Sequence, residues 1–207
     1  MAYAAWLSPS KLSGSGNDTV NVTALSDNTG RNARTTNVTF KAVDCSDVVR
    51  SVSQAGKPEF VNIQSTAAVS KDGVASLTLT GTTNSSKLTF SLGQGATLEV
   101  TLPSTYLANS VQTNNGANID GDPGATQEFN FSITFTDIPA NPTIETRSFQ
   151  VIATDNAGNT STCTVTQAEG DAVLSVSPES LSLAWNAFSE SGSASFSVTS
   201  NTNWTVE

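Results

Sequence analysis

Apolar residues alternate with polar ones along most of this chain, so that every second side chain is hydrophobic. A period of two places one row of side chains on the buried face of a β-strand and leaves the other row in solvent. Helical periodicity is nearly absent. The clearest alternating runs are Val20-Val22-Ala24, Val38-Phe40-Ala42, Leu77-Leu79, Leu88-Phe90-Leu92, Leu98-Val100-Leu102, Phe129-Phe131-Ile133-Phe135, Phe149-Val151-Ala153 and Cys163-Val165. The sequence therefore predicts an all-β fold rather than a disordered chain.

Turn signals rich in glycine, asparagine and aspartate separate the predicted strands at intervals of roughly 8–12 residues, which is typical of immunoglobulin-like β-sandwiches. Residues 58–170 contain at least six predicted strands, enough for one complete middle sandwich. Residues 1–57 contain three or four predicted strands and residues 171–207 about three. Residues 103–128 are expected to form one long loop, in which residues 104–109 could make a helical turn.

The two terminal segments are predicted to be opposite halves of one domain. Residues 1–57 carry the pattern of closing strands, and residues 171–207 carry the pattern of opening strands. Neither half can bury a complete core, and each would expose strand edges that favour aggregation. Missing strands can be supplied by another chain, as in donor-strand complementation. We therefore expect residues 171–207 to be completed by residues 1–57 of a partner chain.

The geometry of the middle sandwich bears on how the halves meet. Such a domain is roughly 40 Å long, whereas a linker of three to five residues spans at most about 10–18 Å. Closure within one chain is therefore difficult, and a two-fold homodimer that exchanges its terminal halves is the leading prediction. A head-to-tail filament, closure within one chain, and a boundary created by processing of a longer protein stay open as alternatives.

The charge balance narrows the possible partners. The formal net charge of −9 argues against a nucleic-acid-binding surface. Residues 1–57 carry six basic and four acidic groups, whereas residues 171–207 carry four acidic groups and no basic one. Charges of opposite sign would attract the two halves, although salt screens this effect.

The start of the chain, MAYAAWLSPSK, has no basic region, long apolar run or cleavage site of a secretory signal. No stretch reaches the length of a membrane span. We therefore expect synthesis in a cytoplasm without export and no membrane partner. Cys45 and Cys163 are few and far apart, as expected of reduced thiols, with Cys163 a small core residue and Cys45 in a turn.

Both ends of the chain carry short motifs of one known family. The closing stretch has Leu174-Ser175-Val176-Ser177-Pro178, then Ala194-Ser195-Phe196-Ser197-Val198, then Asn203-Trp204-Thr205-Val206. The opening stretch has Ala5-Trp6-Leu7-Ser8-Pro9, Asn28-Thr29-Gly30-Arg31-Asn32 and Val52-Ser53-Gln54-Ala55-Gly56. In this order the motifs resemble BACON domains, immunoglobulin-like modules of Bacteroidetes with a proposed association with carbohydrates. The last hairpin of the middle segment, residues 149–168, resembles that of bacterial adhesion-type repeats.

The family resemblance implies a setting as well as a fold. BACON-type domains also occur in virion proteins of crAss-like bacteriophages that infect gut Bacteroidetes. The resemblance therefore implies a non-enzymatic virion protein, a dimeric head fibre that decorates the capsid surface, is made in the host cytoplasm and binds capsid protein. Weak contacts with glycans on the host are a further implication. The alternative is a soluble carbohydrate-binding module of a Bacteroidetes polysaccharide system.

Catalytic and metal sites find little support in the sequence. The chain has no histidine, which excludes serine–histidine and cysteine–histidine chemistry and most zinc sites. No carboxylate lies in an apolar run that would raise its pKa, so we expect no enzymatic activity and no cofactor. Asp120 and Asp122 could ligate calcium, but Pro123 and the missing distal glutamate disrupt an EF-hand pattern, and a simple turn is favoured.

The tryptophans invite comparison with sugar-stacking platforms. Trp6, Trp185 and Trp204 could stack on sugar rings, but the alternation around Trp6 and Trp204 favours the inner face of a sandwich. If the halves combine, these two side chains would lie near the same junction. The predicted interface residues are Trp6, Leu7, Phe196, Val198, Trp204 and Val206.

Overall fold

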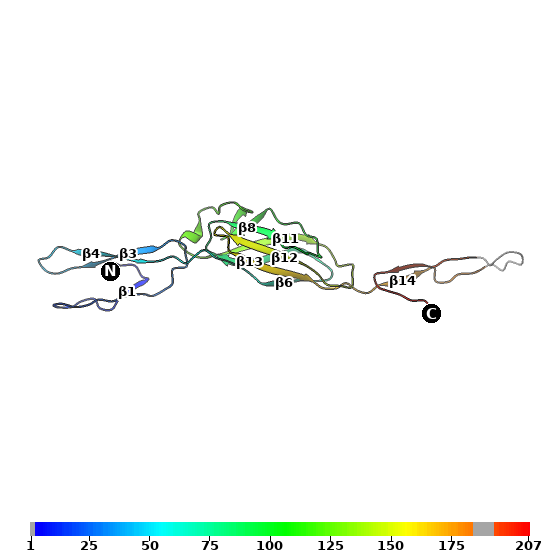
Figure 1. Cartoon of the computed structure of the whole chain (residues 1–207), viewed down its shortest axis with the longest axis horizontal. Helices are drawn as coiled ribbons and strands as arrows, with labels where there is room; N and C mark the ends of the chain where they lie inside the picture. Colours follow the sequence, from blue (N-terminus) through cyan, green and yellow to red (C-terminus); the bar gives the residue numbers. More distant parts are fainter. Residues whose placement is uncertain (1–2, 184–192) are drawn as a thin grey trace.

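The computed structural model describes residues 3–183 and 193–207. These residues form three segments in a row, and the two ends of the chain lie in the outer segments, on opposite sides of the middle one (Figure 1). We call them the N-terminal half-domain (residues 3–57), the middle domain (residues 58–170) and the C-terminal half-domain (residues 171–183 and 193–207). The predicted all-β, immunoglobulin-like sandwich fold is confirmed.

The middle domain consists of two packed sheets. The first has the strand order β10-β9-β11-β7-β5 and the second the order β6-β13-β12-β8. All neighbours pair antiparallel except β6 and β13, which run parallel. The strands of the first sheet are β10 (Val111–Asn114), β9 (Thr105–Ala108), β11 (Phe129–Ile138), β7 (Val74–Thr83) and β5 (Val61–Ile63). Those of the second are β6 (Thr66–Val69), β13 (Thr160–Gln167), β12 (Arg147–Asp155) and β8 (Leu88–Leu92).

The half-domains contain only strand pairs. In the N-terminal half-domain, β1 (Leu7–Pro9) pairs with β2 (Val22–Ala24), and β3 (Arg34–Phe40) pairs with β4 (Val48–Gln54). In the C-terminal half-domain, β14 (Leu174–Ser177) pairs with β15 (Ser197–Ser200). Two-stranded pairs of this kind are marginally stable unless another layer covers them.

One hydrophobic core fills the space between the two sheets of the middle domain. Every second residue of β11 from Phe129 to Phe135 points into it, and the same holds for Phe149 and Val151 on β12. Phe135 packs against Phe149 with ring centroids 5.2 Å apart. Burial of these aromatic and branched side chains supplies most of the driving force for folding.

Two details of the sequence prediction are wrong. Residues 98–102 form no strand, although Leu98 lies in the core and Val100 and Leu102 pack against it. Residues 103–128 are not one long loop. They contain the hairpin β9–β10, which extends the first sheet beyond β11, and the 3₁₀ turn η1 (Pro123–Ala125). Residues 105–108 are extended, and no helical turn forms at residues 104–109.

The two cysteines are free thiols in different environments. Cys163 lies fully buried on β13, and burial raises the pKa of its thiol. Cys45 is exposed in the turn between β3 and β4. The prediction of a core position for Cys163 is confirmed.

Tyr106 gives the middle domain a predicted response to alkaline pH. Its ring packs edge-on against Phe90, and no donor or acceptor among the described residues pairs with its buried hydroxyl. Burial raises the pKa of Tyr106 to about 12. An unfolded tyrosine titrates near pH 10, so this stabilising contribution is complete below pH 10 and is lost as the pH rises through about 12.

We therefore expect the wild-type protein to lose about 2–3 kcal/mol more stability than Tyr106→Phe between about pH 10 and 12. Urea midpoints of the two proteins, compared within and below this window, provide the measurement. At neutral pH the phenylalanine variant should be at least as stable as wild type, because the substitution removes an unpaired buried hydroxyl. Parallel losses in both proteins at alkaline pH would contradict this assignment.

Candidate functional site

The N-terminal half-domain presents an apolar face that is only partly covered. On β3 and β4, the register places Val38, Phe40, Val48 and Val52 on the same side, and we call these four residues the N-terminal apolar face. Val38 is buried, but Phe40 and Val48 are 45% and 43% exposed. The segment therefore lacks the layer that would bury the outer end of this face.

The C-terminal half-domain has a matching apolar face. Leu174 and Val176 of β14 share one side with Val198 of β15 and with the preceding Phe196, and we call these four residues the C-terminal apolar face. Leu174, Val176 and Phe196 are each about half exposed or more. A single-chain soluble domain rarely leaves so many large apolar groups in solvent on so short a segment, so this face is a candidate interaction surface.

The six predicted interface residues fall into two groups at opposite ends of the molecule. Trp6 and Leu7 lie in the N-terminal half-domain, where Leu7 is already buried and the guanidinium of Arg34 stacks over the Trp6 ring at 4.7 Å. In the C-terminal half-domain Val198 is half-buried, and the exposed residues are Phe196, Trp204 and Val206. One chain does not bring the two groups together (Figure 1).

The last residues of the chain lie outside the strand pair of the C-terminal half-domain. Two strands form in the described part of residues 171–207, and Trp204 and Val206 follow β15 without pairing. Both side chains are exposed, Trp204 at 48%. Trp185 lies outside the described residues. The alternation of Trp204 and Val206 thus has the pattern of a strand without the neighbour that a strand needs.

Side-chain and backbone contacts connect the N-terminal half-domain to the middle domain, and we call this contact region the first joint. The Arg31 side chain is largely buried, contacts Glu59 at 3.1 Å and also pairs with Asp122. Its Nη1 donates to the carbonyl of Asn84 at 2.5 Å. Backbone bonds run from Arg31 to Gly124 and from Asn32 to Ala125. These contacts hold the two segments in one orientation.

Asn84 is the centre of this joint. Its fully buried amide donates to the carbonyls of Thr29, Lys57 and Pro58, each at 3.2 Å, and its oxygen accepts from the amide of Phe60 at 3.1 Å. A Cβ on Gly124 would come within 2.0 Å of the Asn84 carbonyl oxygen, so only glycine fits beside it.

The joint also bears on the calcium candidates. The Oδ2 atom of Asp122 pairs with Arg31, so one oxygen of this carboxylate is already engaged. Within residues 3–183 and 193–207, no group of three or more histidine, cysteine, aspartate or glutamate side chains could hold a metal ion. Asp120 and Asp122 lie in the turn before η1, as the sequence favoured, and Asp122 supports the joint.

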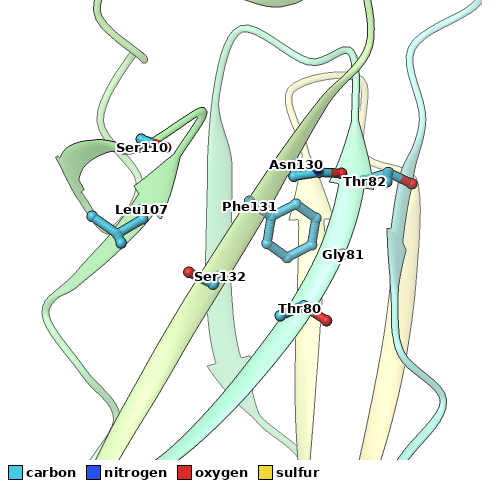
Figure 2. A pocket seen from close by; sticks show the side chains of 8 residues that line it. All are labelled: Thr80, Gly81, Thr82, Leu107, Ser110, Asn130, Phe131 and Ser132. Carbon is cyan, nitrogen blue, oxygen red and sulfur yellow. The ribbon is translucent and has the colours of Figure 1, made fainter.

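A shallow groove of about 450 Å³ lies on the outer side of the first sheet (Figure 2). Leu107 and Ser110 stand on one side of it, and threonines of β7 on the other, with Gly81 and Phe131 at its floor. A Cβ on Gly81 would come within 2.3 Å of the Phe131 ring, so glycine is required at this point. The remaining lining residues are Thr80, Thr82, Asn130 and Ser132.

The chemistry of the groove suits a neutral polar ligand. Hydroxyl groups and one amide offer hydrogen bonds, and Leu107 offers a small apolar contact. None of its lining residues is titratable, so the groove provides neither a general acid nor a general base.

Sequence reasoning missed several of these residues. Phe40, Val48, Leu174 and Val176 lie in alternating runs, but alternation alone does not tell whether a covering layer exists. Arg31 and Asn84 are far apart in sequence and carry no motif that would pair them.

The comparisons with known proteins support a binding module at one end of the chain. The family described as "BACON: Putative binding domain, N-terminal" matches residues 1–55. This range coincides with the N-terminal half-domain, and the matched family is one of binding rather than catalytic domains. No curated protein matches the chain. Within the described residues, no helix is long and apolar enough to cross a membrane. The N-terminal segment is therefore similar to a BACON-type binding domain.

Proposed function

We propose that this chain is a non-enzymatic structural and adhesive module that holds immunoglobulin-like domains in a row. The observation that supports this proposal is the linear arrangement of the three β segments, with the chain ends on opposite sides of the middle domain (Figure 1). A fixed joint through Arg31 and Asn84 supports a spacer role, because it resists bending between segments. The match of residues 1–55 to a binding family supports an adhesive role.

The more specific proposal is a capsid-decorating fibre on the virion of a bacteriophage, with capsid protein as a partner. Its support is the resemblance of both chain ends to BACON domains that occur in virion proteins of crAss-like phages. Many copies on one particle would turn weak individual contacts into strong attachment through avidity, by roughly 10²–10⁴-fold.

Particle purification tests this proposal. Virions banded on a density gradient from an infected Bacteroidetes culture are expected to carry the chain, detected by an antibody raised against the whole protein. Removal of soluble protein by a second gradient should leave the ratio of chain to capsid protein unchanged. Particles without the chain, with all of it in the soluble fraction, would contradict a virion role.

A soluble carbohydrate-binding module is the second candidate, and the groove on the first sheet favours it. The expected ligand is a neutral glycan, since the lining offers hydroxyl groups and the Asn130 amide without any charge. On a glycan array, the full chain should then give saturable binding. Asn130→Ala should weaken it by about tenfold, the effect of losing roughly one hydrogen bond.

Asn62→Ala is the matched control for the groove. Asn62 is exposed on β5 in the same row of the sheet as Thr82 and Asn130 but does not line the groove. Binding should be unchanged in this variant. Equal loss in both variants, or no saturable binding by the wild-type chain, would exclude the groove as a glycan site.

A further inference from the structure

The closing hairpins of the N-terminal half-domain and of the middle domain are held by the same hydrogen bonds. In each, an asparagine amide donates to two backbone carbonyls, at 2.8–3.2 Å: Asn28 to Asn32 and Ala55, and Asn141 to Glu145 and Ala168. The same number of residues separates Asn28 from Asn141, Asn32 from Glu145 and Ala55 from Ala168. The two hairpins β3–β4 and β12–β13 are therefore structural equivalents.

Each of the two hairpins also contains an arginine–glutamine pair, and the two pairs are separated by the same number of residues as the asparagines. Nε of Arg34 donates to the Gln54 side chain at 2.7 Å, and Nε of Arg147 donates to the Gln167 side chain at 3.2 Å. In both cases the arginine opens the first strand of the hairpin and the glutamine closes the second. The N-terminal half-domain thus ends as the middle domain ends.

The C-terminal half-domain begins as the middle domain begins. Leu174 pairs with Ser200 as Val61 pairs with Thr83. After these strands, one asparagine oxygen accepts a backbone N–H in each segment: Asn201 from Val173 at 2.8 Å, and Asn84 from Phe60 at 3.1 Å. The chain therefore carries the last part of one domain, a complete domain, and the first part of another, all built on one plan.

The two joints also repeat. The Asn84 amide donates across the first joint to the carbonyl of Thr29, and the Asn201 amide donates across the second to that of Pro142. Backbone bonds from Lys57 to Gly30 and from Gly170 to Thr143, at 2.9 and 2.7 Å, occupy equivalent places. Each segment is therefore set on the next in the same way.

We infer that the C-terminal half-domain of one copy binds the N-terminal half-domain of another, and that copies add head to tail in an open row. The composite domain would have the plan of the middle domain, because the two halves carry its opening and closing parts. The N-terminal and C-terminal apolar faces would cover each other. The acidic C-terminal half, which has no basic residue, would meet a half with six basic residues.

The repeated joint decides between an open row and a closed pair. In a closed two-fold dimer, two middle domains and two composite domains must form a ring, so each joint has to turn the chain sharply. The joints instead place the segments in a row (Figure 1). A head-to-tail contact closes into a ring only if its repeated rotation completes a full turn, and segments set in a row generate an open assembly instead.

The residues that follow β15 can be placed in the composite domain. In the middle domain, β8 follows Asn84, buries Leu88 and Phe90, and pairs with β12. Trp204 and Val206 follow Asn201 with the same period of two, one residue closer to it than Leu88 and Phe90 are to Asn84. They would form the corresponding strand on β3 of the second copy, the equivalent of β12, and Trp204 would become buried.

Analytical ultracentrifugation of the full chain over a wide concentration range tests the inference. The expected result is a mass that rises with concentration beyond two chains, with a blue shift of tryptophan emission that Trp204→Phe diminishes. A mass that stops at two chains overturns the open row in favour of a closed pair. A single-chain mass at every concentration overturns completion by a second copy.

Two blocking variants make the test independent of overall stability. Phe40→Asp and Val176→Asp change residues that are 45% and 47% exposed, so the middle domain should keep its fold. Each variant alone should remain a single chain, and their mixture should stop at two chains, because one intact junction is left. A mixture that stays as single chains, or growth of either variant alone, overturns the inference.

The matched controls lie on the opposite side of the same strands. Asn37 of β3 and Ser175 of β14 are exposed and point away from the apolar faces. Asn37→Asp and Ser175→Asp add the same charge to the same half-domains and should assemble like wild type. If these controls prevented assembly as strongly as Phe40→Asp and Val176→Asp do, the added charge would explain the effect. That result would overturn the role of the apolar faces.

Discussion

Phe135→Ala is expected to lower the free energy of unfolding of the middle domain by about 3–5 kcal/mol, the usual cost of a large cavity in a packed core. Phe135 is 1% exposed and packs against Phe149, so little of the space can be refilled. The buried thiol of Cys163 provides the measurement. In a Cys45→Ser background, its labelling rate under native conditions reports how often the middle domain opens.

Phe40→Ala is the matched control for this substitution. It removes the same side chain from β3, where Phe40 is 45% exposed and has no complete core around it. Measured at a concentration where the chain is monomeric, it should change the opening of the middle domain by less than about 0.5 kcal/mol. Comparable losses in both variants would contradict the assignment of Phe40 to a surface outside the core of the middle domain.

Asn84→Ala is expected to cost about 2–4 kcal/mol, because it leaves several buried backbone groups without partners. The amide of Asn84 serves carbonyls on both sides of the first joint, so its loss should also loosen the N-terminal half-domain. Thiol labelling of Cys163 measures the loss of stability. Trypsin cleavage after Arg31, whose side chain the joint holds, should accelerate and measures the loosening.

Asn201→Ala is the corresponding change at the second joint. Asn201 makes equivalent bonds to Asp171 and Pro142 but is only half-buried, so water can replace the lost amide. We expect a cost of about 1 kcal/mol or less for the middle domain. Unchanged labelling and unchanged cleavage after Arg31 in Asn84→Ala would contradict the central place of Asn84 in the joint.

Strands in which apolar and polar residues alternate could be predicted from the sequence, because the alternation of neighbouring residues determines which side chains face the core. β11 as far as Phe135 and β12 follow this rule, since every second residue is buried. Residues 98–102 show its limit. Leu98 is buried and alternates with Val100 and Leu102, but the segment packs on the core without pairing in a sheet. Alternation reports burial, whereas a strand also requires a neighbour for its backbone.

The hairpin β9–β10 shows the opposite limit. Its strands are four residues each and carry few branched side chains, so local propensity for a strand is weak. Pairing of β9 with β11 supplies the backbone partners that propensity does not. The candidate groove depends on the same pairing, because Leu107 reaches it only when β9 lies beside β11.

The sequence by itself determined the all-β class, the division into a middle domain and two terminal segments, and the opposite charges of those segments, because these depend on local periodicity and composition. Only the tertiary structure decided where Asn84 and Asn201 lie, that the two joints repeat, and which apolar residues lack a cover. The physical reason is that a hydrogen bond or a buried contact between distant residues depends on how the strands pair. That pairing is a property of the whole fold rather than of any one segment.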